Sequence, residues 1–150
     1  MRMVVPKATA EPKNFALRLQ NRRDLAQHFL VSAALAAGAE AGVSNVVGLY
    51  KEISDSRGGS GFSFADLTAD RAGTRFGELA TASNASARRL QQQMSGGVAE
   101  PDIMPLATDL PEGMSEAEFQ RRYREVGSPE YRALMGVIER RVSACSLYRG

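Results

Sequence analysis

Apolar residues recur every three to four positions along much of the chain, which is the period of an amphipathic helix. The clearest stripe follows Ser128, a predicted N-cap, and consists of Tyr131, Leu134, Met135, Ile138, Val142 and Cys145. A second stripe begins near Asn21 and includes Leu25, Phe29 and Ala36. No segment shows the sustained alternation of a strand, so the pattern predicts an all-α fold of four to five helices.

Two further helix starts are marked by capping residues. Ser63, with Asp66 three residues later, matches a capping box and predicts a helix that continues toward Ala87 or beyond. Ser115 and Glu118 form a second box, which predicts a short helix. Both boxes place a hydroxyl where it can accept a hydrogen bond from the first turn.

The distribution of prolines and small residues suggests how the chain is divided. Residues 1–14 contain two prolines and show no apolar period, so we expect a flexible basic leader there. Residues 98–114 contain three prolines, which predicts a Pro-rich loop. A chain of 150 residues suits one domain, and we expect residues 15–150 to form a single compact helical domain.

The least polar stretch, residues 25–50, is rich in Ala and Gly and contains a histidine and a glutamate. A spanning helix needs about 20 strongly apolar residues, so we expect no transmembrane span here. Ala34, Gly38 and Gly42 follow one another at intervals of four. Small side chains at this spacing allow two helices to approach closely, which predicts a tight crossing or a kink.

The net charge of +2 is unevenly distributed. Residues 1–23 form a basic N-terminal arm and residues 24–114 are acidic, so this arm is a candidate for contact with an anionic partner. The single cysteine, Cys145, excludes a disulfide within the chain and is expected to be buried. The start of the chain has no apolar run of signal-peptide length. We therefore expect a cytoplasmic protein, or a periplasmic one if a signal segment has been removed.

Several ionisable side chains fall inside otherwise apolar helical segments. They are His28, Lys51, Glu52, Asp55, Asp66 and Asp70. Asp66 and Asp70 are four residues apart, so their carboxylates share one helix face. Like charges at that distance repel unless a cation, a proton or a basic partner lies between them. Lys51, Arg71 and His28 are the candidate partners, and the six residues form a candidate polar pocket.

Such a pocket has two interpretations. If all members are satisfied, it is a structural network that fixes one arrangement of the Ala- and Gly-rich helices. If it is open, carboxylates can hold Mg²⁺, Ca²⁺ or Mn²⁺, with His28 as a ligand or base. Structural zinc is not expected, because one His and one distant Cys do not supply its usual ligand set. No nucleotide is expected, since the glycine-rich loop at 56–61 lacks the Lys and Ser/Thr of a P-loop.

Three motifs together resemble the YfiM-type bacterial lipoproteins. They are the dipeptide that begins at His28, GLYKEISD at 48–55 and GFSFADLTADRAG at 61–73. The resemblance covers about residues 24–77 and implies an envelope location, although it supplies no reaction. The chain departs from the family pattern by having no lipidated cysteine and by carrying Asp70 in place of an asparagine.

Three functions follow as hypotheses. The first is a small, non-enzymatic bacterial helical protein, associated with the envelope, whose polar cluster is structural. The second is a metal-dependent hydrolase that uses the same cluster. The third is an interaction module that binds an anionic partner through its basic arm. A protein partner or self-association fits the sequence better than nucleic acid, because acidic residues interleave the C-terminal arginines.

Overall fold

The computed structural model describes residues 15–38 and 61–149. Within these residues the chain forms six α-helices, one 3-10 turn and no β-strand, which confirms the predicted all-α class. The elements are α1 (Arg23–Gly38), α3 (Phe64–Thr81), α4 (Asn84–Ser95), α5 (Glu100–Ile103), α6 (Glu116–Tyr123), α7 (Pro129–Ala144) and η1 (Ser146–Tyr148). The predicted leader at 1–14 lies outside the described residues.

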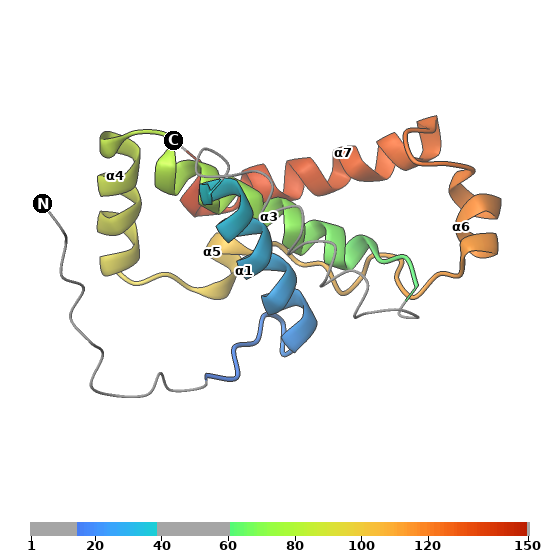
Figure 1. Ribbon diagram of the computed structural model, residues 1–150, viewed down its shortest axis with the longest axis horizontal. Helices are drawn as coiled ribbons and strands as arrows, with labels where there is room; N and C mark the ends of the chain where they lie inside the picture. The colour runs from blue at the N-terminus through green and yellow to red at the C-terminus, as the bar shows by residue number, and fades with distance from the viewer. Residues whose placement is uncertain (1–14, 39–60, 150) are drawn as a thin grey trace, which may run out of the picture.

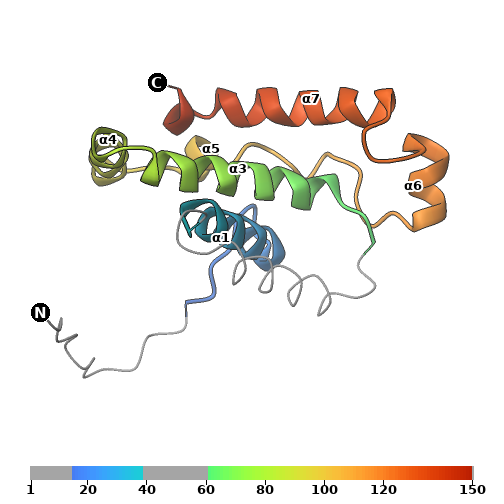
Figure 2. The same cartoon turned by 45° about the horizontal axis from the view of Figure 1, so that its top comes forward.

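Helix α3 occupies the middle of the molecule, with α1 on one side and α7 on the other (Figures 1 and 2). Helices α3 and α7 run in the same direction, because both begin near α6 and both end near α4 (Figure 1). The segment after α5 runs back along α3 to reach α6 (Figure 1).

The predicted capping residues act as expected. The side chain of Ser63 accepts a hydrogen bond from the amide of Asp66 at 3.0 Å. Ser115 accepts from Glu118 at 3.2 Å, and Ser128 accepts from its own first turn. These hydroxyls satisfy amides that have no partner inside the helix.

The prediction of one helix running from Phe64 toward Ala87 was wrong. Helix α3 ends at Thr81, and Ser83 begins α4 by accepting a hydrogen bond from the amide of Ser86 at 3.0 Å. The hydroxyl of Ser86 in turn donates to the Leu79 carbonyl at 2.6 Å. A side chain that offers the backbone an alternative partner can therefore end one helix and start the next.

The segment at 98–114, predicted as a Pro-rich loop, contributes to the core. It contains the short helix α5 and buries the side chains of Met104, Ala107, Leu110 and Met114. Phe62 and Met114 exchange two backbone hydrogen bonds, at 2.8 and 3.1 Å. These contacts hold the segment against the start of α3.

Five aromatic rings pack together between helix α6 and the first turns of α3 and α7. They are Phe62, Phe64, Phe119, Tyr123 and Tyr131. The closest pair, Phe62 and Phe119, has ring centroids 4.3 Å apart. Such tilted and edge-on contacts stabilise a core beyond the apolar area they bury.

The described residues contain a close helix crossing that was not predicted from the sequence. Ala34 is exposed, and Gly42 lies outside the described residues. Gly73 and Gly77 of α3 face the backbone of α1. A Cβ atom at Gly73 would lie 2.1 Å from the Phe29 carbonyl oxygen, and one at Gly77 would lie 2.2 Å from that of Ala33. The two helices therefore approach as closely as they do only because these two positions have no side chain.

Candidate functional site

The imidazole of His28 lies between the two carboxylates of Asp66 and Asp70. Its Nδ1 atom is 2.9 Å from Asp70 Oδ1, and its Nε2 atom is 3.3 Å from Asp66 Oδ2. The histidine comes from α1, and the two aspartates lie one turn apart on α3. The three groups thus connect the two helices beside the glycine crossing.

Ser32 adds a fourth group to this cluster. Its hydroxyl donates to Asp70 Oδ1 at 2.9 Å, so that oxygen accepts from two residues of α1. The sequence pattern places Ser32 on the apolar face of the helix, and it is buried there. Its position four residues after His28 is the signal that it shares the histidine's partner.

Asp66 has two separate roles. Its amide donates to Ser63 at the start of α3, whereas its side chain turns away from the cap toward His28. The second carboxylate oxygen, Oδ1, is buried and has no hydrogen-bond partner among the described residues. An unpaired buried acceptor costs free energy, so this atom is the one unsatisfied point of the cluster.

The cluster favours the protonated form of His28. Burial by itself lowers the pKa of the imidazole, but hydrogen bonds and charge from Asp66 and Asp70 outweigh it and raise the pKa to about 9. At neutral pH the ring therefore carries a positive charge between two negative ones. With both nitrogens protonated, each N–H has its own carboxylate acceptor.

The other residues predicted around Asp66 and Asp70 do not pair with them within the part of the chain that the structure describes. Arg71 pairs with Glu139 of α7, at 3.1 Å, rather than with the aspartates of its own helix. Lys51, Glu52 and Asp55 lie outside the described residues. Of the six candidate residues, the structure therefore brings together His28, Asp66 and Asp70.

The geometry restricts what the cluster can do chemically. A protonated His28 offers no lone pair to a metal or to a substrate proton. In the part of the chain that the structure describes, no set of three His, Cys, Asp or Glu side chains is arranged to hold a metal ion. None of the described helices combines the length and the apolar character needed to cross a bilayer.

Comparisons with known proteins give no relative: no family model, no curated protein and no solved structure matches the chain. The geometry of the cluster is therefore the basis for a function.

Proposed function

We propose that this chain is a non-enzymatic helical domain in which His28, Asp66 and Asp70 form a structural network. The observation that carries the proposal is that both ring nitrogens of His28 lie within 3.3 Å of a carboxylate. A catalytic base or ligand needs one nitrogen available, whereas a structural clamp uses both.

The position of the network explains what it would stabilise. Helix α1 packs on α3 through a glycine crossing, which brings the two backbones together, and through apolar side chains such as Phe29, whose ring centroid lies 5.8 Å from that of Phe76. The side-chain hydrogen bonds of His28 and Ser32 to Asp70 set the rotation and register of α1 on α3. Paired polar groups such as His28, Ser32 and Asp70 can specify one such arrangement among several of similar packing energy.

The experiment compares Asp70→Ala with Glu125→Ala, which removes an exposed carboxylate. Asp70 holds both His28 and Ser32, so we expect its loss to lower the free energy of unfolding by about 1–3 kcal/mol. The Glu125 variant should change it by less than about 0.5 kcal/mol. Urea denaturation followed by circular dichroism measures both, and equal midpoints for the two variants would refute a structural role.

A metal-dependent hydrolase is the second candidate, and the buried, unpartnered Oδ1 atom of Asp66 favours it. A divalent cation is one partner that such an oxygen accepts. Titration of the full chain with Mn²⁺ and Ca²⁺ separates the two candidates. The structural network predicts an unchanged melting temperature, while a metal site predicts a rise that Asp66→Ala abolishes.

The location belongs to the same proposal. We propose an envelope-associated bacterial protein on the resemblance of residues 24–77 to the YfiM-type lipoproteins. Fractionation of bacterial cells that express the full-length gene, with periplasmic and cytoplasmic marker enzymes measured in parallel, tests it. Recovery of the protein with the cytoplasmic marker would contradict the assignment.

A further inference from the structure

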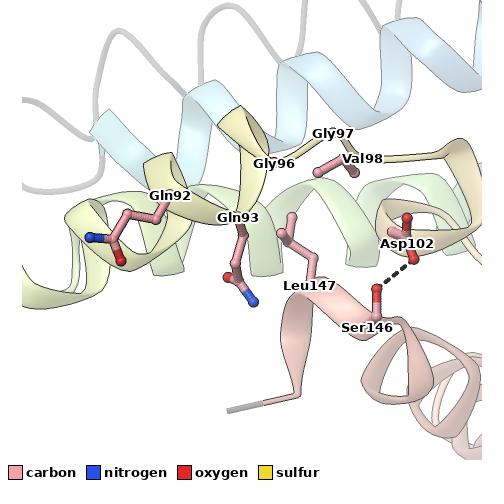
Figure 3. Close-up of a pocket in the computed structure, with 8 residues that line it drawn as sticks. All are labelled: Gln92, Gln93, Gly96, Gly97, Val98, Asp102, Ser146 and Leu147. Carbon is pink, nitrogen blue, oxygen red and sulfur yellow. Dashed lines mark hydrogen bonds between the residues drawn. The ribbon is translucent and has the colours of Figure 1, made fainter.

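A cavity of about 260 Å³ opens where the end of α4, the helix α5 and the turn η1 meet. Figure 3 shows Asp102 and Ser146 together on one side of it and Gln93 on the other, with Leu147 between them. The lining contains none of the residues of the His28 cluster, so this is a separate place in the molecule.

The charge of this cavity is one-sided. Asp102 is its one charged lining residue, and no Lys, Arg or His lines it. The last turn of α4 also borders the cavity, and the C-terminus of a helix carries a partial negative charge from the helix dipole. Helix and carboxylate therefore both favour a positively charged group.

Asp102 is held in place for such a contact. Its Oδ1 atom accepts from the Ser146 hydroxyl at 2.5 Å, and its Oδ2 atom accepts from the Ala99 amide at 2.8 Å. These hydrogen bonds lower the pKa of the carboxyl, so the group is ionised at neutral pH. Each carboxylate oxygen can accept a second hydrogen bond, which leaves capacity for a ligand donor.

Two apolar side chains in the lining suit an alkyl chain. Val98 and Leu147 also line the cavity, and Leu147 is largely buried. The side-chain amide of Gln93 adds an acceptor opposite Asp102. An ammonium group on a short aliphatic stem would place its charge at Asp102 and its methylenes against these apolar side chains.

A second cavity, between α3 and α7, lacks this asymmetry. Arg71 pairs there with Glu139 at 3.1 Å, and Arg75 pairs with Glu78 at 3.7 Å. Each charge in that lining already has an opposite partner, so an ion would have to displace an existing pair.

We propose that the cavity between α4, α5 and η1 binds a primary alkylammonium group, of the kind carried by a lysine side chain or a free diamine. Asp102 provides the charge, Gln93 an acceptor, and Val98 with Leu147 the apolar wall. This is a binding site, and it is independent of the role proposed for the His28 cluster.

The test is a titration of the ¹⁵N-labelled full chain, followed by NMR amide shifts. Three probes are compared: cadaverine, Nα-acetyl-lysine N-methylamide, and the norleucine analogue of the latter, which lacks the ammonium group. We expect saturable shifts at 93–102 and 145–148 with the two ammonium probes, and at least tenfold weaker binding of the norleucine analogue. Tighter binding of the lysine derivative assigns the site to a partner protein, and tighter binding of cadaverine assigns it to a free diamine.

Variants complete the experiment. Asp102→Asn removes the charge and keeps the shape, so it should weaken both ammonium probes about tenfold. Glu125→Gln removes an exposed charge elsewhere and should leave both affinities unchanged. Circular dichroism confirms that each variant is folded. Equal binding of norleucine and lysine derivatives, or unaltered affinity in Asp102→Asn, would overturn the proposal.

Discussion

His28 is the single histidine of the chain, and its protonation depends on residues of another helix. A carboxylate pair one turn apart on α3 would be unfavourable alone, because the two negative charges repel. The imidazolium between them turns that repulsion into attraction from both sides. The charge on His28 is therefore part of what holds α1 in place, which makes the contact sensitive to pH.

The first prediction is that stability falls as the solution becomes alkaline. The pKa of His28 is about 9 in the folded chain, against 6.5 for an unperturbed histidine, so the folded state binds the proton more tightly. The stabilisation is complete below about pH 6.5 and is lost as pH rises through about 9. After allowance for the partial exposure of the cluster, we expect a loss of about 2 kcal/mol. Urea denaturation at pH 6, 8 and 10 measures it.

His28→Gln is the control for that series. Glutamine keeps a donor toward the carboxylates but does not titrate, so its stability should vary less with pH over the same interval. An NMR titration of the imidazole ring in the unaltered chain gives the pKa directly. A midpoint near 6.5 would show that the two aspartates do not act on the ring.

At the scale of the elements, the contact between α1 and α3 combines this charged cluster with a close backbone approach. Gly73 and Gly77 lie on the face of α3 that carries Asp66 and Asp70 toward α1. The glycines fix the distance between the helices, and the polar groups fix their rotation. Neither feature alone specifies the pair, so both are sensitive to single substitutions.

The second prediction concerns Gly73. In Gly73→Ala the new methyl group would lie 2.1 Å from the Phe29 carbonyl oxygen, and backbone atoms on both sides must move to relieve the contact. We expect a loss of about 3 kcal/mol in the free energy of unfolding. Thermal and urea denaturation of the two proteins provide the measurement.

Gly136→Ala is a matched control on α7. A Cβ atom at Gly136 meets only the flexible end of Arg140, at 3.5 Å, so the substitution should follow helix propensity. It should raise stability by about 0.5–1 kcal/mol. If both alanine variants shift stability in the same direction, the close backbone approach at Gly73 does not make alanine unfavourable at that position.

Local signals predicted much of the helical architecture from the sequence. The hydroxyl caps at Ser63, Ser115 and Ser128 act within one turn, and the apolar stripe of α7 needs only its own periodicity. The break at Ser83 was missed because it depends on which of two hydrogen-bonding options the backbone takes. The glycine crossing at Gly73 and Gly77 was not predicted, since spacing shows which positions are small but not which partner they face.

The candidate site was also predictable only as far as local spacing determines it. The spacing of Asp66 and Asp70 requires a positive partner, and His28 was one of three candidates. Choosing among them requires the relative placement of α1 and α3, which is a tertiary property. The pairing of Arg71 with Glu139 likewise depends on where α7 lies.

At the scale of the whole molecule, the C-terminal turn connects elements that are distant in sequence. The hydroxyl of Tyr148 lies 3.1 Å from the Ala72 carbonyl of α3 and 2.8 Å from the Ile103 carbonyl of α5. The ring is buried, and burial raises the pKa of its hydroxyl, so it remains a donor at neutral pH. One side chain thus joins η1, the central helix and the start of the returning segment.

The last prediction follows from this connection. Tyr148→Phe keeps the buried ring but removes the one hydroxyl hydrogen that lies between the Ile103 and Ala72 carbonyls, so we expect a loss of about 1–2 kcal/mol. Tyr131→Phe is the matched control, because the Tyr131 hydroxyl has no hydrogen-bond partner among the described residues, and it should change stability by less than about 0.5 kcal/mol. If the C-terminal turn instead frays independently, Tyr148→Phe will leave the urea midpoint unchanged and only speed amide exchange at 145–149. A loss of about 1–2 kcal/mol in Tyr148→Phe would instead show that the turn belongs to the cooperative fold. Removing a contact lowers the free energy of global unfolding only if that contact breaks when the whole chain unfolds.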